Sequence, residues 1–285
     1  MTRQTRPLFL VLLAGACVSS PLARRTTPRP TTPTAAPSGP STAGPWAMRP
    51  GTAPQNVLVS TQAVVTITGD PATRVDSLRS TLDASYAQLP GNARRLDGRL
   101  AAFQVASGAG ALASVAGLAV PVRFSVEIGG AAAGFHLPTA SNVCTSPSLS
   151  VMQGLYDAWT LLPDTLGLRT EWTDTVQTIS CRDRVPMKGT SVRHFRVARA
   201  DVENGRVVVT VERRAKTRLA GEGEQFGEHV TIDGQGESTV RYALDVQSAR
   251  FVRASGTSNL ELSFKSKLRN QRVRQESQLS ISWTP

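Results

Sequence analysis

The sequence predicts a mainly β protein of the α+β class, a curved antiparallel meander or half-barrel with one covering helix at about residues 147–162. Three observations support this prediction. Apolar and polar residues alternate along several segments after residue 55, which is typical of strands with one buried face. Short polar turns separate these segments and favour antiparallel pairing of consecutive strands. Only one long segment has apolar residues at helical spacing.

Several strands can be placed from this alternation. Residues 78–86 fit a period of two, although part of the segment would also suit a helix, and a strand is preferred there. Residues 122–128 alternate cleanly between apolar and polar side chains. Further strands are predicted at about 192–200, 207–211, 240–244, 260–264 and 279–283.

Two dipeptides indicate where the chain turns. Asn204-Gly205 is the strongest hairpin signal in the sequence. Asp233-Gly234 marks a second turn or, alternatively, a bulge within one long strand. A basic run spans another predicted turn, where a solvated turn is favoured over a contact for anionic lipid or surface polysaccharide. The run comprises Lys265, Lys267, Arg269, Arg272 and Arg274.

The predicted helix can begin with Ser146 as its cap and Pro147 at its first position, and Pro163 ends it. A sheet with one buried face needs a covering layer, so we expect the apolar stripe of this helix to pack on the sheet. A ligand-lining role is the alternative. The stripe comprises Leu149, Met152, Leu155, Tyr156, Trp159 and Leu162.

Residues 1–17 are predicted to be a lipoprotein signal peptide. Basic residues precede a short apolar run, and the small residues Ala14-Gly15-Ala16 lead directly to Cys17. The run is too short to cross a bilayer as a permanent helix. A cysteine in this place resembles the lipobox of bacterial lipoproteins, which implies a lipid anchor on Cys17, although Ala14 stands where leucine is usual. The alternative is an ordinary cleavage site with an incidental cysteine.

Residues 18–54 are predicted to be a disordered tether, because this Pro/Thr-rich segment offers too little apolar surface to order itself. In polyproline geometry it would reach about 110 Å. The mainly β domain is expected at residues 55–285, as one unit or as two halves at 55–145 and 146–285.

Cys144 and Cys181 are the two cysteines that remain once Cys17 carries lipid. An even pair in an oxidising compartment predicts one disulfide. A metal pair is the rival interpretation, but no histidine or further cysteine lies close to either residue in the sequence.

The formal net charge of +11 is unevenly distributed. Residues 1–54 carry six arginines and no acid, which leaves 26 basic against 21 acidic residues in the rest of the chain. A nucleic-acid-binding protein needs a concentrated basic face, with aromatic side chains on which bases can stack. The sequence has no such pattern, so no nucleic-acid partner is predicted.

The sequence carries no familiar catalytic or metal-binding motif. Its histidines, His136, His194 and His229, are far apart and lack metal-ligand spacing. No metal and no cofactor is therefore predicted. A hydrolase whose site is assembled from distant residues stays open as an alternative, because catalytic triads are defined by geometry.

The order of features after residue 162 resembles a group of uncharacterised bacterial envelope lipoproteins with a strand-rich C-terminal meander. The stretches that carry the resemblance are Leu162-Pro163-Asp164, Glu171-Trp172-Thr173-Asp174-Thr175 and Gly234-Gln235-Gly236. Arg169-Thr170 stands where that group has a glycine. The predicted fold is also similar to periplasmic lipoprotein carriers, whose curved half-barrel sheet wraps helices, and this similarity implies an apolar ligand.

The leading hypothesis is a non-enzymatic protein that binds or carries an apolar or amphiphilic ligand. The resemblance to bacterial lipoproteins implies export to the cell envelope, and within that resemblance Val18 rather than Asp after Cys17 implies an anchor in the outer membrane facing the periplasm. An envelope scaffold or assembly partner that binds another protein is the alternative. The ligand is expected between the helix and the concave sheet face, near Leu155, Trp159, Leu162, Tyr242, Leu260 and Phe264.

Overall fold

The computed structural model describes residues 42–284, apart from residues 50, 70–72, 90–91, 116–117, 119, 128–133, 137–142, 159, 183, 226 and 268–269. The predicted signal peptide with Cys17, most of the predicted tether and Trp159 lie outside the described residues. Predictions about these parts stay predictions.

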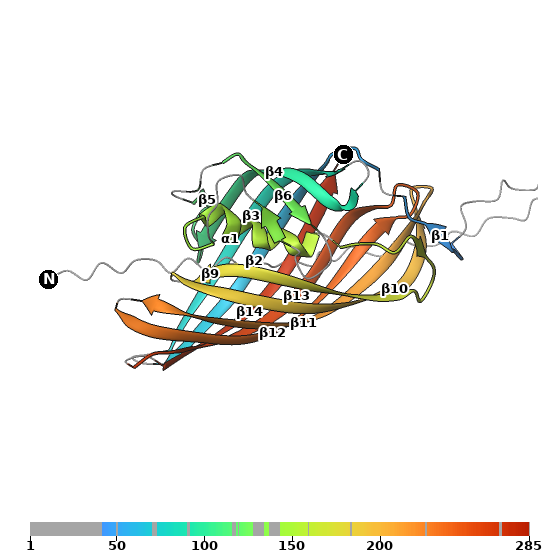
Figure 1. Ribbon diagram of the computed structural model, residues 1–285. Coiled ribbons are helices and arrows are strands. Elements are labelled where there is room, and N and C mark those ends of the chain that lie inside the picture. Colours follow the sequence, from blue (N-terminus) through green and yellow to red (C-terminus); the bar gives the residue numbers. More distant parts are fainter. Residues whose placement is uncertain are drawn as a thin grey trace, which may run out of the picture.

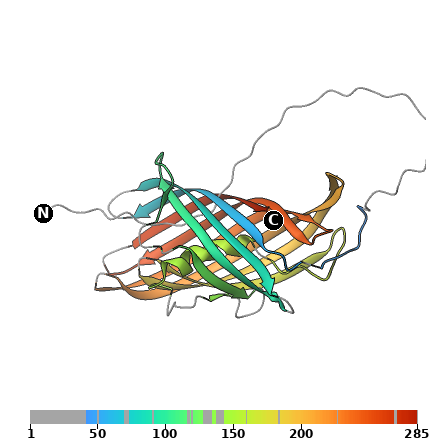
Figure 2. The same ribbon diagram turned by 90° about the horizontal axis from the view of Figure 1, so that it is seen from above.

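The described residues form one long antiparallel sheet, and its curvature is visible in Figures 1 and 2. Its strands are β2 (Gln55–Gly69), β3 (Arg74–Leu89), β4 (Asn92–Ser107), β5 (Ala113–Ser114), β6 (Val122–Glu127), β7 (Gly134–His136), β9 (Glu171–Arg182), β10 (Val185–Glu203), β11 (Arg206–Gln225), β12 (Glu228–Asp245), β13 (Arg250–Lys265) and β14 (Asn270–Thr284). Their spatial order is β7-β6-β4-β3-β2-β14-β13-β12-β11-β10-β9, with β5 beside β4. The sheet is open, and the predicted fold class is confirmed.

One long-range pairing joins the two ends of the domain. β14 runs antiparallel to β2, from Gln271 opposite Gly69 to Thr284 opposite Asn56. Strands from before and after residue 146 therefore belong to a single sheet. Because a strand's register decides which side chains point to which face, this pairing makes the inward residues of both parts face one hollow.

The predicted hairpin at Asn204-Gly205 is confirmed. The two residues link β10 to β11 and have positive φ angles of 50° and 76°, as a type I′ turn requires. Asp233-Gly234, in contrast, is not a turn. It lies inside the continuous strand β12, where Asp233 is paired with Ala220 on one side and Ser263 on the other. Residues 78–86 are a strand, within β3.

A short helical segment lies in the hollow of the sheet (Figures 1 and 2). The α-helix α1 (Pro147–Met152) begins at the predicted residue but gives way to a 3₁₀ helix, η1 (Gln153–Ala158), so the expected end at residue 162 is wrong. Gly154 is a poor helix former at the junction, which disfavours a longer regular helix. The segment still covers the sheet, through the buried side chains of Val151, Met152, Leu155 and Ala158.

Two apolar clusters occupy the inward face of the sheet. The larger cluster surrounds the helical segment and contains residues of β2, β3, β4, β6 and β10–β14. The smaller cluster lies farther along the same face, towards the β11–β12 and β13–β14 turns. It comprises Ala63, Val65, Val185, Met187, Val230, Ile232, Leu262, Phe264 and Val273.

Buried polar side chains separate the two clusters along the strands. The hydroxyl of Thr61, between Val59 of the larger cluster and Ala63 of the smaller, donates to the carbonyl oxygen of Ser80 at 3.0 Å. On β14, Gln275 Nε2 donates to Ser277 Oγ at 3.1 Å. Buried polar groups need such partners, and the Thr61–Ser80 bond, which crosses from β2 to β3, forms only when these two strands are in this register.

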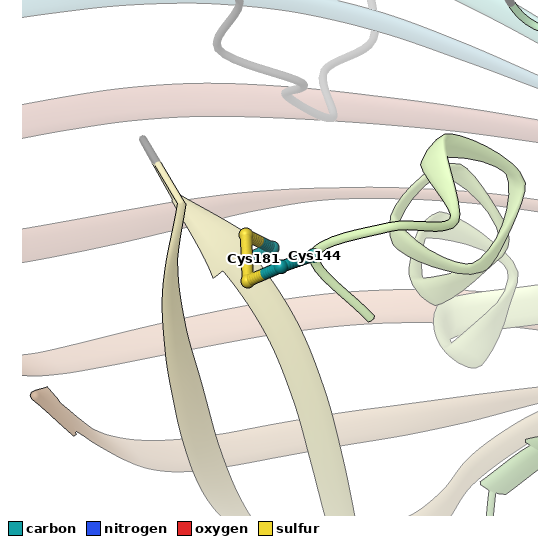
Figure 3. The surroundings of a disulfide bond; sticks show 2 residues. All are labelled: Cys144 and Cys181. Carbon is teal, nitrogen blue, oxygen red and sulfur yellow. A yellow bond between two sulfur atoms is a disulfide. The ribbon is translucent and has the colours of Figure 1, made fainter. Parts of the chain in front are cut away.

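The predicted disulfide is confirmed. Cys144 and Cys181 are bonded, with their Cα atoms 4.9 Å apart. Figure 3 shows that the bond joins the segment before α1 to the far end of β9. The bond therefore fixes where the chain enters the hollow.

Replacing both cysteines, Cys144→Ala with Cys181→Ala, is expected to lower the free energy of unfolding by up to about 4 kcal/mol. The bond closes a loop with a sequence separation of 37 and so restricts the unfolded chain. Guanidinium unfolding of the oxidised chain, the reduced chain and the double variant measures the effect. Equal unfolding midpoints for all three would show that the disulfide does not stabilise the fold.

Candidate ligand-binding site

The described residues of segment 46–54 lie over one end of the hollow, and we call them the strap. β1 (Trp46–Ala47) pairs with β8 (Thr165–Leu166), and Met48 N donates to Asp164 O at 2.8 Å. Met48 is buried in the larger cluster. The predicted disordered tether extends to residue 54, and for the strap this prediction is wrong. Trp46 and Met48 pack on the larger cluster and anchor the strap, despite the Pro-rich composition around them.

A cavity of about 290 Å³ lies under the strap. The strap, the facing ends of β3 and β4, the residues after η1 and the start of β13 line it. This volume is near the lower end of the range for ligand pockets and suits one small ligand or a single alkyl chain. The apolar lining residues include Met48, Leu96, Ala158, Leu161, Leu162 and Phe251.

Arg250 is the one positively charged residue among the described residues that line this mostly apolar cavity. Its Nη2 donates to Ala53 O at 2.6 Å and to Gly51 O at 3.5 Å, which ties the strap to β13. A guanidinium has five N–H donors, and the rest of those of Arg250 have no partner among the described residues. Arg250 can therefore hold the strap and still present donors to an anionic group.

Thr160 places a second polar group in the cavity lining. The side chain is buried, and its hydroxyl oxygen has no hydrogen-bond partner within the described residues. A buried polar group without a partner costs about 1–3 kcal/mol. A ligand with a matching donor or acceptor would remove that cost.

Asp245 organises the turn between β12 and β13, directly before Arg250. Its carboxylate accepts hydrogen bonds from Arg206 Nη1 at 2.8 Å, Gln247 N at 2.9 Å and Ser248 Oγ at 3.0 Å. Burial raises the pKa of Asp245, but these hydrogen bonds outweigh burial and hold the pKa below its ordinary value. The ionised carboxylate thus sets the turn that delivers Arg250 to the cavity.

A buried ion pair fixes η1, whose last residue, Ala158, lines the cavity. Arg193 donates from Nε and Nη2 to the two carboxylate oxygens of Asp174, at 2.7 and 2.6 Å. Its Nη1 donates to Tyr156 O in η1 at 3.0 Å. Below this contact Trp172 and Phe195 stack with ring centroids 4.9 Å apart. Removing one partner of a buried pair costs about 3–5 kcal/mol, so the helical segment depends on this contact.

The structure does not bring the predicted ligand-contacting residues to one place. Leu155 and Tyr242 are buried in the larger cluster, where side chains fill the space between η1 and the sheet. Leu162 lines the cavity under the strap. Leu260 and Phe264 lie at the smaller cluster, towards the other end of the hollow. The open space is thus at the end of the helical segment and not along it.

Sequence reasoning missed Arg250, Thr160 and the strap. Trp46 and Met48 are the signal that could reveal the strap, since they are isolated large apolar residues in a Pro-rich segment. Arg250 and Thr160 carry no comparable signal. Their roles depend on contacts between segments that are far apart in the sequence.

The described histidine side chains do not form a catalytic group. His194 Nδ1 lies 3.0 Å from Thr173 Oγ1, and His229 Nδ1 lies 3.8 Å from a carboxylate oxygen of Glu224, so neither has both an acid and a hydroxyl beside it. Within the ranges that the structure describes, no three His, Cys, Asp or Glu side chains gather in a way that could hold a metal ion. Those ranges also contain no helix with the length and apolar character needed to span a membrane.

Comparisons with known proteins identify no family. No protein-family model matches the chain, and no curated protein matches its sequence at a significant level. The function is therefore inferred from the cavity and its polar groups.

Acid is expected to weaken the β12–β13 turn through Asp245. Because the pKa of this carboxyl is lower in the folded chain, its stabilisation is complete above its unfolded pKa of about 4 and is lost as pH falls through the folded pKa. Urea unfolding between pH 7 and pH 2 should therefore show a smaller loss on acidification for Asp245→Asn than for the native chain. Asp201→Asn, outside the turn, is the control. A full acid loss in Asp245→Asn would rule out this carboxyl as the group responsible.

Proposed function

We propose that this protein binds a single-chain amphiphile with an anionic head group, in the cavity under the strap. The observation that carries the proposal is a mostly apolar cavity with Arg250 among its lining residues. Burying an alkyl chain gains about 25 cal/mol per Å² of apolar surface removed from water. A guanidinium matches a carboxylate or phosphate in both charge and hydrogen-bond geometry. Arg250 supplies the head-group contact, and Thr160 supplies a further hydrogen bond.

The proposal extends to where the protein works. A lipid on Cys17 would hold the chain at the periplasmic face of the outer membrane, and the tether would let the domain reach ligands away from that membrane. The lipobox-like leader supports this placement. The fold-level similarity to periplasmic lipoprotein carriers supports an apolar or amphiphilic ligand. The proposed role is non-enzymatic binding or carriage.

A fluorescent long-chain carboxylate and the alcohol of the same chain length test the two parts of the site. The chain with Cys17→Ser, purified without detergent, is expected to bind the carboxylate at least about tenfold more tightly than the alcohol, given about 1.5–3 kcal/mol for a hydrogen bond to a charged group. Arg250→Gln should remove this preference while it keeps binding of the alcohol. Leu162→Trp, which enlarges a side chain of the cavity lining, should weaken both ligands.

Leu58→Trp is the matched control, because Leu58 is exposed and lies outside the cavity lining. Far-ultraviolet circular dichroism and thermal unfolding of each variant establish that the fold is retained. Equal binding by Leu162→Trp and the native chain would contradict the proposed site. Equal weakening by Leu162→Trp and Leu58→Trp would also contradict it.

A further inference from the structure

A second hollow lies on the opposite, outward face of the sheet, at the end away from the strap. It has a volume of about 1020 Å³, and residues of β10, β11, β12, β13, β14 and β2 line it. These six strands are consecutive neighbours in the sheet, so the hollow extends for about 24 Å at about 4.8 Å per strand. The right-handed twist of long strands accounts for a concave outward surface here. We call this hollow the outer groove.

Charge alternates across the outer groove in a fixed order. The pairing of the strands places Lys188 on β10, Asp233 on β12 and Arg272 on β14 in one transverse row. The order along this row is positive, negative, positive. The next row repeats this order with Arg218, Glu261 and Arg274. The groove thus has two cationic sides and an acidic centre.

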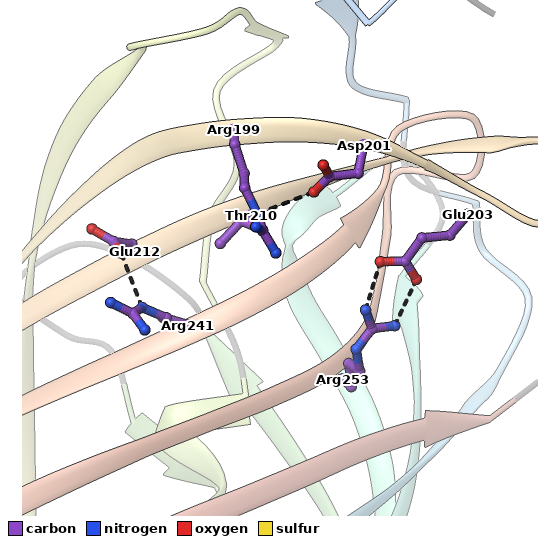
Figure 4. A network of polar contacts seen from close by, with 7 residues as sticks. All are labelled: Arg199, Asp201, Glu203, Thr210, Glu212, Arg241 and Arg253. Atoms are coloured by element: carbon purple, nitrogen blue, oxygen red, sulfur yellow. Dashed lines mark hydrogen bonds and ion pairs between the residues drawn. The ribbon is translucent and has the colours of Figure 1, made fainter. Parts of the chain in front are cut away.

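At the other end of β10–β13, on the same face, several opposite charges form ion pairs. Figure 4 shows these ion pairs. Arg253 donates to both carboxylate oxygens of Glu203, at 2.9 and 2.7 Å. The other pairs drawn there are Arg241 with Glu212 and Arg199 with Asp201.

The groove cations differ from these paired arginines. Lys188, Arg218 and Arg272 have no carboxylate within ion-pair distance among the described residues. Arg274 pairs with Glu276, which is outside the groove lining. Three exposed cations are therefore available to an anionic partner on both sides of the acidic centre.

We propose that the outer groove binds an extended segment of a partner protein, with acidic residues at both ends and an amide-rich or basic centre. The cations of β11 and β14 are three strands apart, about 14 Å, which an extended peptide covers in about four residues. Such a segment can place carboxylates at the two cationic sides and a lysine or amide opposite Asp233 and Glu261. Such a segment complements the groove in the order of its charges as well as in its net charge.

Other polyanions fit this surface less well. A polymer with a negative charge on every unit would bring charge against Asp233 and Glu261. None of the described residues that line the groove is aromatic, so the groove has no ring on which a base or a sugar could stack. A flat lipid surface cannot follow a concave surface. A protein segment with spaced acidic residues meets none of these obstacles.

Fluorescence anisotropy tests the proposal with a labelled seven-residue peptide that has two glutamates at each end and Gln-Lys-Gln in its centre. The Cys17→Ser chain should bind it, and should bind a peptide with lysine ends and a glutamate centre at least about tenfold more weakly. Arg218→Glu, and Lys188→Glu combined with Arg272→Glu, should each weaken the first peptide by about tenfold or more. Binding should also weaken as salt rises.

Arg214→Glu is the matched control for these variants. Arg214 is an exposed arginine on β11, outside the groove lining, and the change in charge is the same as in Arg218→Glu. An effect of less than about twofold is expected for it. Equal loss in Arg214→Glu and Arg218→Glu, or equal binding of both peptides, would overturn the proposal as general charge attraction. Binding of polygalacturonate or phosphatidylglycerol vesicles without binding of the peptide would overturn a protein partner.

Discussion

The pairing of β2 with β14 is the constraint on which both faces of this protein depend. It joins the N-terminal strands β2–β7 to the C-terminal meander, and it fixes which residues of each point inward. A shift of one residue would exchange the two faces of β2 relative to the rest of the sheet. The inward face would then lose the core contacts of Val57 and Val59, and the outward face would lose Thr66 and Thr68 from the edge of the outer groove.

The inward face combines tight packing with one opening. Side chains of η1 fill the hollow, and the ion pair of Arg193 with Asp174 holds η1 against β9 and β10. The opening lies where the helical segment stops at Ala158 and the strap passes over β13. A cavity at the end of a rigid core is preorganised, since the residues around it are fixed by contacts that need no ligand.

Much of the fold could be predicted from the sequence, because one buried face leaves a period of two along each strand. The hairpin at Asn204-Gly205 and the disulfide could also be predicted. The hairpin follows from the turn preferences of two adjacent residues, and the disulfide follows from the even number of cysteines that remain beside Cys17. The site was not. The apolar stripe predicted Leu155 as a ligand contact, but a stripe cannot distinguish a filled interface from an open one. Arg250 and the groove cations become functional candidates only when register and twist bring separate strands together.

A ligand in the cavity under the strap is the central claim, and native mass spectrometry tests it most directly. The Cys17→Ser chain would be purified without detergent, and its mass compared with that of the bare chain with its disulfide intact. The account predicts one additional molecule per chain, with a reproducible mass that organic extraction identifies as a single-chain amphiphile with an anionic head. The mass of the bare chain alone, with no extractable amphiphile, would contradict it.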